Sequence, residues 1–288
     1  MLRTVLVNLD SDTDRLDWMR GQLHRLKLPF DRFSALRGDH LPEELRRYFV
    51  LDSEPRPLTT GEVGCYASHL AIMEALVRDG EPAALVLEDD LELRPHLLDV
   101  LAAVERFPAD WDIVRLSGHV KTAVWPALPI APGVELVKYS RVPLGTGAYL
   151  ISLKGAQRYL AWAGRSRRRH PVDQDLRRVW DCGLATYGVT PTPVEQDVLQ
   201  RSSIDTIARR PPHAGLRGKL KLRGWGYFFE PFIRPAYNLR FLGVRGWLST
   251  AVIMLAAQLD RRYRRRLRAR INGAPRAGTP AAADADAA

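Results

Sequence analysis

The stretch from Ala83 to Asp90, Ala-Ala-Leu-Val-Leu-Glu-Asp-Asp, limits the possible folds more than any other part of the sequence. Its five apolar residues are too few to span a membrane, and Gly80 and Pro82 precede them. This short apolar run after a turn signal predicts a buried strand. In open α/β sheets, ligands bind outside the carboxyl ends of the strands. We therefore expect the acidic end of this stretch to lie beside a crevice at the edge of a sheet.

Three adjacent carboxylates, Glu88, Asp89 and Asp90, end this strand and predict a site for a divalent metal ion. Carboxylates close together in a low-dielectric environment raise one another's proton affinity, so a cation or a basic partner is needed to neutralise them. Carboxylate oxygens suit Mg²⁺ and Mn²⁺, which keep open positions for water and substrate phosphates. Strand alternation predicts Glu88 and Asp90 on one side and Asp89 on the other. A solvated acidic loop is the alternative.

Positive charge is concentrated in the last part of the 288-residue chain, whose net charge is +10. Residues 206–288 hold 17 Lys and Arg against 4 Asp and Glu, whereas residues 1–205 carry a slight negative charge. This asymmetry predicts a catalytic domain over 1–205 and a basic, aromatic-rich helical appendage over 206–272. The Ala/Pro/Gly-rich tail 273–288 is expected to be disordered.

Alternating strand and helix signals predict an α/β fold. A capping box, Thr59-Thr60-Gly61-Glu62, predicts a helix that runs to Gly80. Strands are expected at Thr4–Leu9, Leu28–Phe33, Trp111–Leu116, Val134–Tyr139, Ala148–Ser152 and Gly188–Pro193, and further helices after Asp12, from Pro95 to Val104, from Lys154 to Ala163 and from His170 onward. Residues 38–57 and 118–133 are expected to be mainly loops.

The chain has two cysteines, Cys65 and Cys182, which make no disulfide framework and favour a reducing compartment. The apolar run at the N-terminus is too short for a signal peptide and is expected to be the first strand. Gly145-Thr146-Gly147 lacks the third glycine of a dinucleotide fingerprint, but its glycines permit close approach of a ligand to the backbone. The basic loop 165–169 could hold an anionic acceptor or be solvated.

Several residues are candidates for binding a nucleotide. Asn8 and Leu9 lie at the carboxyl end of the first predicted strand, where a base or ribose could bind, and Arg15 could reach a phosphate or be a surface charge. His69 lies near the middle of a predicted helix, where a histidine is more often structural than catalytic.

Together these residues resemble glycosyltransferase family 25, which includes bacterial lipooligosaccharide galactosyltransferases and collagen galactosyltransferases. The resemblance covers about residues 3–200. It rests on Val7-Asn8-Leu9 followed by Arg15, on Gly61-Glu62-Val63-Gly64-Cys65 with Ser68-His69, on Leu87-Glu88-Asp89-Asp90, on Gly147-Ala148-Tyr149 with Ile151-Ser152, and on Pro171-Val172-Asp173.

The resemblance implies a GT-A-like fold, in which a mixed sheet flanked by helices binds a nucleotide sugar and the anomeric carbon is inverted. It also implies that Glu88, Asp89 and Asp90 stand in for an aspartate-x-aspartate motif and hold Mn²⁺ or Mg²⁺, although Glu88 departs from that motif. UDP-galactose is the expected donor. Its expected contacts are Asn8, Leu9, Arg15, Glu62, Ser68, His69 and Gly147.

Sugar transfer requires stabilisation of the departing diphosphate and removal of a proton from the acceptor hydroxyl. Asp173 is the predicted base and Asp175 the second candidate, because both lie on a separate turn well past the metal strand. Asp173 could instead cap the helix that starts there. The alternatives to a glycosyltransferase are a nucleotidyl- or phosphotransferase that uses the same metal site, and a non-catalytic scaffold docked on a membrane.

The basic C-terminal part predicts binding to an anionic membrane surface. Gly246–Leu259 is apolar for 14 positions, too short to span a bilayer, and Arg261–Arg266 is basic apart from Tyr263. An interfacial helix is expected, with the alternative of a helix packed on the domain. Its expected headgroup-level aromatics are Trp225, Phe228, Phe229, Trp247 and Tyr263.

This location suits a lipid-linked or surface glycan acceptor, such as lipopolysaccharide or lipooligosaccharide, on the cytoplasmic face of the inner membrane. The basic charge is accompanied by no known nucleic-acid-binding motif, so nucleic acid is not an expected partner.

Overall fold

A computed structural model of the chain describes residues 2–53, 56–118, 120, 122–196 and 226–273. The predictions for Trp225 and for the tail beyond residue 273 lie outside these residues, as do the side chains of Phe228 and Phe229. The strands are β1 (Arg3–Asn8), β2 (Asp31–Ser34), β3 (Ala83–Glu88), β4 (Leu91–Leu93), β5 (Ile113–Arg115), β6 (Val124–Ala131), β7 (Val134–Tyr139), β8 (Ala148–Ser152), β9 (Thr186–Thr190) and β10 (Val194–Gln196).

The helices are α1 (Thr13–Arg25), α2 (Glu43–Arg46), α3 (Thr60–Asp79), α4 (Leu97–Ala102), α5 (Leu153–Ala163), α6 (Val172–Arg177), α7 (Val179–Cys182), α9 (Gly226–Leu259) and α10 (Arg261–Asn272), with a short 3₁₀ turn η1 (Val104–Arg106). The predicted bounds of β7 and β8 are confirmed, and the acidic stretch does follow a buried strand, β3.

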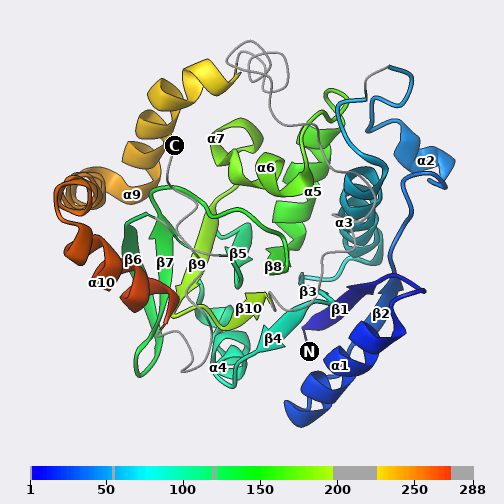
Figure 1. Cartoon of the computed structure of the whole chain (residues 1–288), viewed down its shortest axis with the longest axis horizontal. Coiled ribbons are helices and arrows are strands. Elements are labelled where there is room, and N and C mark those ends of the chain that lie inside the picture. The colour runs from blue at the N-terminus through cyan, green and yellow to red at the C-terminus, as the bar shows by residue number, and fades with distance from the viewer. Residues whose placement is uncertain (1, 54–55, 119, 121, 197–225, 274–288) are drawn as a thin grey trace.

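Eight strands form one mixed sheet in the order β2-β1-β3-β8-β5-β9-β7-β6, and β10 pairs with β4 in a separate ribbon. Strands β2, β1, β3, β5 and β9 run in the same direction, whereas β8 and β7 run against their neighbours. The carboxyl ends of β1, β3, β5 and β9 therefore meet the amino end of β8 at one edge (Figure 1). The predicted α/β fold, with helices flanking a large mixed sheet, is confirmed.

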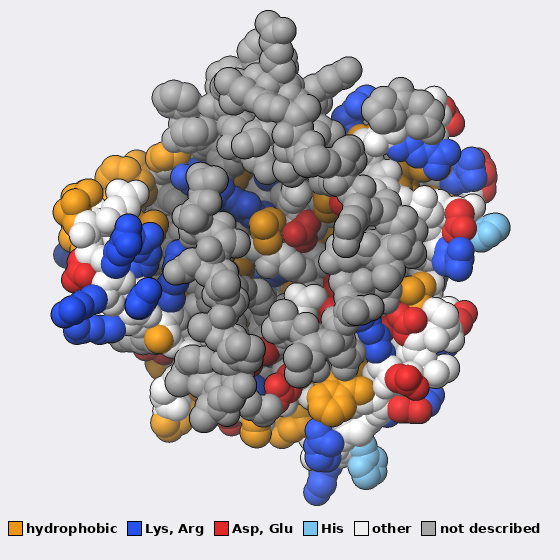
Figure 2. Space-filling model, viewed as in Figure 1, with side chains coloured by type: hydrophobic (Ala, Val, Ile, Leu, Met, Phe, Trp, Pro, Cys, Tyr) orange, Lys and Arg blue, Asp and Glu red, His pale blue; other side chains and the backbone are white. Residues whose placement is uncertain are grey.

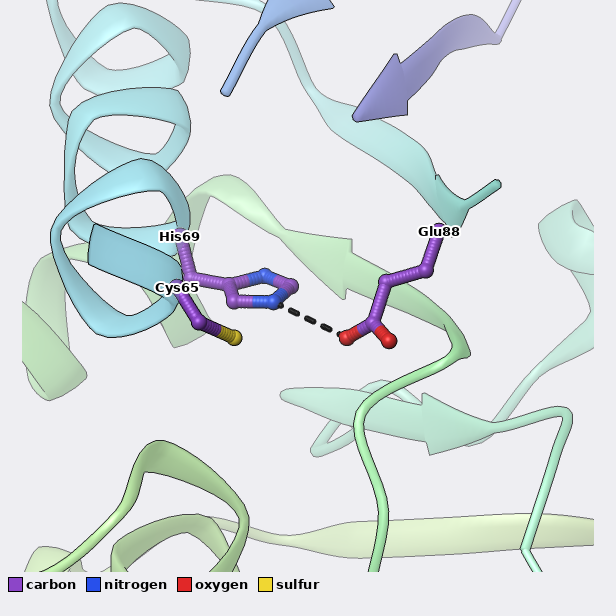
Figure 3. Close-up of side chains that lie close together, drawn as sticks. All are labelled: Cys65, His69 and Glu88. Carbon is purple, nitrogen blue, oxygen red and sulfur yellow. Dashed lines mark hydrogen bonds and ion pairs between the residues drawn. The ribbon is translucent and has the colours of Figure 1, made fainter. Parts of the chain in front are cut away.

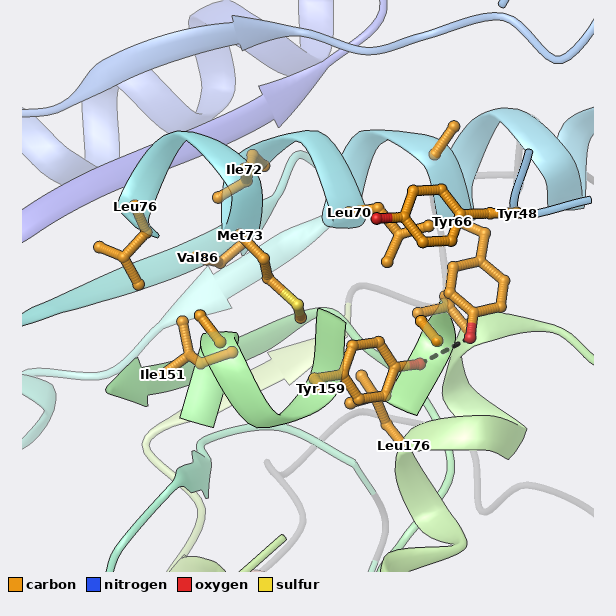
Figure 4. Packing of buried hydrophobic residues seen from close by; sticks show 14 of the residues in the cluster. Tyr48, Tyr66, Leu70, Ile72, Met73, Leu76, Val86, Ile151, Tyr159 and Leu176 are labelled. Carbon is orange, nitrogen blue, oxygen red and sulfur yellow. Dashed lines mark hydrogen bonds between the residues drawn. The ribbon is translucent and has the colours of Figure 1, made fainter. Parts of the chain in front are cut away.

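Helices cover both faces of this sheet because successive strand residues point to opposite sides. On one face Val86 and Ile151 pack against Tyr66, Leu70 and Met73 of α3 and against α5 (Figure 4). On the other face Leu87 and Leu150 pack against α1 and α4. The predicted capping box starts α3. Thr59 Oγ1 accepts a hydrogen bond from the Glu62 amide at 3.3 Å, and Glu62 Oε2 accepts one from the Thr59 amide at 2.9 Å.

The expectation of a loop over 118–133 is wrong for residues 124–131, which form strand β6. Its sequence, Val-Trp-Pro-Ala-Leu-Pro-Ile-Ala, has no strict alternation of apolar and polar residues and contains two prolines. Proline is tolerated at sheet edges and bulges, where it need not donate to a ladder. β6 is one of the two edge strands of the sheet, and its pairing with β7 shifts register beside both prolines.

The C-terminal helices pack against the sheet, as the alternative interpretation of this segment predicted. Tyr237 Oη donates to the Leu184 carbonyl at 2.8 Å, and Asn238 donates to the Ser140 carbonyl at 2.8 Å. At the end of α10, Asn272 exchanges hydrogen bonds with the backbone of Val120 at 2.8 and 3.0 Å. One side of this pair of helices is therefore part of the folded body.

The 14 apolar positions that the sequence indicated, Gly246–Leu259, form the last part of a longer helix, α9. Residues Ile233–Leu259 of α9 are long and apolar enough to cross a membrane by length and composition, with 17% of the apolar window buried. Gly243 has φ 70° and ψ 170°, however, and breaks the helix (Figure 1). The part after Gly243 rises about 24 Å at 1.5 Å per residue, less than a hydrocarbon core of about 30 Å.

Candidate active site

The edge where the parallel strands end brings together side chains that are far apart in the sequence. Asn8 ends β1, Glu88 ends β3 and Arg115 ends β5. Gly147 comes just before β8, and its carbonyl accepts a hydrogen bond of 2.7 Å from the Glu88 amide. A Cβ on Gly147 would lie 2.9 Å from Leu91 and 3.2 Å from the Ser117 hydroxyl, so the backbone is closely packed here.

Asp89 points toward α1, away from Glu88. Its Oδ2 accepts a 2.7 Å hydrogen bond from Asn8 Nδ2, and its Oδ1 lies 3.2 Å from Arg15 Nη1. Burial raises the pKa of Asp89 despite these two partners. The predicted candidates Asn8 and Arg15 are thus beside the acidic stretch, and in this structure both bind Asp89.

Glu88 points toward α3. Its Oε1 accepts a 2.6 Å hydrogen bond from Thr146 Oγ1 and lies 3.2 Å from His69 Nε2, while His69 Nδ1 lies 2.9 Å from the Tyr149 hydroxyl. Burial raises the pKa of Glu88, but the interactions with His69 and Thr146 outweigh burial and bring it below its ordinary value. Glu88 is 24% exposed, so its carboxylate remains accessible from the edge of the sheet.

Asp90 has one carboxylate oxygen without a protein partner. Oδ2 accepts a 2.7 Å hydrogen bond from Gln196, but Oδ1 is buried and bonded to none of the residues that the structure describes. Burial, and then the Glu88 charge, raise the pKa of Asp90. A buried carboxylate oxygen that lacks a donor is suited to accept a cation.

Cys65, His69 and Glu88 place three potential metal-ligand atoms within 4.8 Å of one another (Figure 3). Cys65 and His69 are four residues apart and therefore share a face of α3. That spacing was available in the sequence, but Cys65 was not chosen as a candidate. Burial, and next the Glu88 charge, raise the pKa of Cys65 well above its ordinary value, so the thiol stays protonated.

The two candidate bases have different surroundings. Asp173 is partly exposed, and its Oδ2 accepts a 3.3 Å hydrogen bond from the Gly145 amide; it lies in the first turn of α6 and does not cap it, so the capping alternative is wrong. Asp175 is buried, accepts a 2.9 Å hydrogen bond from Tyr66 Oη and lies 3.6 Å from Arg168. Burial raises the pKa of Asp175 to about 6.

Three other predicted contacts of the donor have local structural partners. Glu62 belongs to the capping box of α3, and the Leu9 carbonyl accepts a hydrogen bond from the Asp12 amide at 3.0 Å. Ser68 is fully buried; its hydroxyl donates to the Gly64 carbonyl and accepts from the Leu36 amide, both at 2.8 Å. Ser68 therefore holds the segment after β2 against α3.

These features define an α/β protein with charged and hydrogen-bonding side chains gathered at the carboxyl edge of a mixed sheet. Residues 1–175 match the family model described as "Glycosyltransferase family 25 (LPS biosynthesis protein)". The chain belongs to glycosyltransferase family 25, which confirms the resemblance seen in the sequence.

Two relatives place the chain within this family. Procollagen galactosyltransferase 1-B of Xenopus laevis is 31% identical over 188 residues, which is 61% of this chain and 30% of that protein. The human protein named inactive glycosyltransferase 25 family member 3 is 31% identical over 189 residues, with 61% and 31% covered. The chain thus spans less than a third of the length of these curated relatives.

A solved glycosyltransferase involved in glycosylation of the major capsid of PBCV-1 aligns with 9% identity and a TM-score of 0.31. That alignment covers 57% of this chain and 68% of the viral one. A likeness this weak adds nothing to the assignment.

Proposed function

We propose that this protein is an inverting, metal-dependent glycosyltransferase of GT-A type that moves galactose from UDP-galactose to a glycan. Membership of family 25 and the galactosyltransferase names of several relatives support the class of reaction and the sugar. The observation that carries the proposal is the buried Oδ1 of Asp90, which has no donor among the described residues and lies in the same acidic stretch as Glu88. Such an oxygen fits a cation site.

Mn²⁺ or Mg²⁺ fits the oxygen ligands of this edge. Asp90 and Glu88 would hold the ion, and Asp89, which Asn8 and Arg15 already bind, is the third candidate. When bound, such an ion offsets negative charge on a departing diphosphate. His69 and Thr146 fix the Glu88 carboxylate by hydrogen bonds and so orient it toward the site.

Asp173 is the proposed general base that takes the proton of the acceptor hydroxyl. It is partly exposed and keeps one carboxylate oxygen outside its hydrogen bond to Gly145. Asp175 is less suited to this role, because Tyr66 and Arg168 surround its buried carboxylate. In this proposal Asp175 supports the position of α6.

Donor contacts are proposed at the same edge. Asn8 ends the first strand and Leu9 follows it, where a base or ribose could bind, and Arg15 offers a positive charge beside Asp89. Gly147 is a further proposed contact, because it comes just before β8 at the same edge. Glu62 and Ser68 are weaker candidates for contacts with the donor, because both side chains already make hydrogen bonds within or at the start of α3.

Release of UDP from a panel of nucleotide sugars, measured with and without Mn²⁺, tests the proposal. UDP-galactose should be turned over only with the metal. Asp173→Asn should keep UDP affinity but lower turnover by about 10²- to 10⁴-fold, the usual contribution of a positioned base. Gln174→Ala, next to it on α6, is the control that should retain activity. Unchanged turnover in Asp173→Asn would remove the residue from this role.

A non-catalytic protein is the second candidate, because a relative at 31% identity is named inactive. It predicts no metal-dependent heat on titration with UDP. A nucleotidyl- or phosphotransferase would instead turn over a nucleoside triphosphate with no sugar present.

The C-terminal helices are proposed to bind an anionic membrane surface, with residues 1–205 as the catalytic domain and 206–272 as the binding part. An exposed apolar stripe runs along α9 at three- and four-residue steps: Val244, Leu248, Val252, Leu255 and Leu259. Arg261–Arg266 follows at once, and Figure 2 shows basic side chains gathered beside hydrophobic ones at this end of the molecule. An apolar stripe beside arginines suits an interfacial helix.

A lipid-linked or surface glycan, such as lipopolysaccharide or lipooligosaccharide, is the proposed acceptor. The cytoplasmic face of the inner membrane is the proposed location, and it rests on the sequence alone.

A further inference from the structure

Arg115, the last residue of β5, carries a buried positive charge that makes no hydrogen bond or ion pair with the residues that the structure describes. Arg115 is 1% exposed. Its Nε, Nη1 and Nη2 atoms have no hydrogen-bond partner among residues 2–53, 56–118, 120, 122–196 and 226–273. A guanidinium cannot lose its proton in a protein, and a buried charge without a partner is strongly unfavourable. Among the described residues, therefore, no hydrogen-bond partner offsets the cost of burying this cation.

A second buried group without a described partner, the Tyr139 hydroxyl, lies close to the strand pair that holds Arg115. On the sheet, Arg115 pairs with Tyr149 of β8 and with Gly188 of β9. A Cβ at Gly188 would lie 1.8 Å from Tyr139 Oη, so the glycine is what admits the Tyr139 ring. The Tyr139 hydroxyl is also buried without a partner in the described part of the chain.

Arg115 also lies within electrostatic reach of both groups that the proposed reaction needs. Glu88, at the end of β3, and Asp173, in the first turn of α6, both act on its charge, although the structure shows no ion pair between Arg115 and a described carboxylate. Strand alternation and register put Arg115, Tyr149 and Glu88 on the α3 side of the sheet. The charge of Arg115 is thus felt by both the proposed metal ligand Glu88 and the proposed base Asp173.

We propose that Arg115 binds the diphosphate of the nucleotide-sugar donor, with the Tyr139 hydroxyl as a second donor. This inference rests on the function proposed above. A planar guanidinium fork matches two phosphate oxygens, and a neutral sugar hydroxyl would leave the buried charge uncompensated. Because its nitrogens are bonded to no described residue, an incoming anion would displace no hydrogen bond between Arg115 and those residues. Its fixed charge would then stabilise the leaving diphosphate.

Titration calorimetry of the full chain in Mn²⁺ with UDP, pyrophosphate and uridine tests the inference. Arg115→Met, which removes the charge but keeps much of the side-chain volume, should weaken UDP and pyrophosphate binding at least about 30-fold and leave uridine binding unchanged. The ligand-free variant should melt no lower than wild type, because the uncompensated charge is gone. Arg106→Met, whose arginine donates to the Ile130 carbonyl away from this edge, is the control.

The outcomes separate this inference from the proposed function. If wild type binds UDP and Arg115→Met binds it equally well, or loses uridine binding to the same degree, Arg115 is not a diphosphate ligand. If wild type binds pyrophosphate through Arg115 but not UDP, the anion site stands and the nucleotide-sugar function fails. If wild type binds neither pyrophosphate nor UDP, both the anion site at Arg115 and the nucleotide-sugar function are contradicted. Should Arg115→Met fail to fold, Arg115→Lys, which keeps the charge and loses the fork, should still lower UDP affinity about tenfold.

Discussion

The carboxyl group of Asp175 is buried, and replacing it with an amide should change how the stability of the protein depends on pH. The side chain is 2% exposed, receives a hydrogen bond from Tyr66 and faces Arg168. Asp175→Asn keeps an oxygen that can accept from Tyr66 but removes the titrating group. The comparison with wild type therefore isolates the cost of holding this carboxylate ionised inside the protein.

The size of the effect follows from the pKa of Asp175, which burial raises from 3.8 to about 6. A shift of about two units corresponds to about 3 kcal/mol at 1.36 kcal/mol per unit. Because the folded pKa is above the unfolded one, the folded state binds more protons between pH 4 and pH 6. The contribution of Asp175 to stability is therefore fully present below pH 4 and is lost as pH rises through 6.

Urea unfolding at a series of pH values from 4 to 7 measures this contribution. The free energy of unfolding of wild type minus that of Asp175→Asn should fall by about 3 kcal/mol across this range, whatever its value at pH 4. Gln174→Ala, which has no titrating group to lose, should follow the wild-type curve. A difference between wild type and Asp175→Asn that stays constant from pH 4 to 7 would refute the assignment of a raised pKa.

Three other changes test the sheet, the metal site and the C-terminal helix. Gly188→Ala should destabilise the fold by about 1–3 kcal/mol or more in urea unfolding, because its Cβ would overlap the buried Tyr139 ring, whereas Gly21→Ala, with its nearest contact at 3.8 Å, should not. Asp90→Asn should lower Mn²⁺ affinity in calorimetry at least tenfold; unaltered affinity would place the ion elsewhere. Val252→Glu should reduce co-sedimentation with anionic vesicles about tenfold, since Val252 is 66% exposed on the apolar stripe; equal binding would argue against that face.

Local patterns in the sequence determined much of the fold. The apolar run before Glu88 was short, followed a turn and ended in charge, so it predicted β3 and its position at a ligand edge. Thr59 and Glu62 predicted the start of α3 because a capping box satisfies backbone donors within four residues. Alternation also predicted that Glu88 and Asp89 would point to opposite sides, as their different hydrogen-bond partners show.

Tertiary structure alone decided what each charged group meets. Strand order and burial decide whether Asp89 binds Arg15 and whether Cys65 comes near Glu88. They also decide that Arg115 has no hydrogen-bond partner among the described residues. The sequence pattern of an edge strand such as β6 is weak, because its formation depends on pairing with its one neighbour, β7, more than on its own residues. Hydrogen bonding and desolvation act between residues that are distant in the chain. A local pattern can therefore indicate a charged residue as a candidate for the site, but only the folded chain sets its partner and its exposure to water.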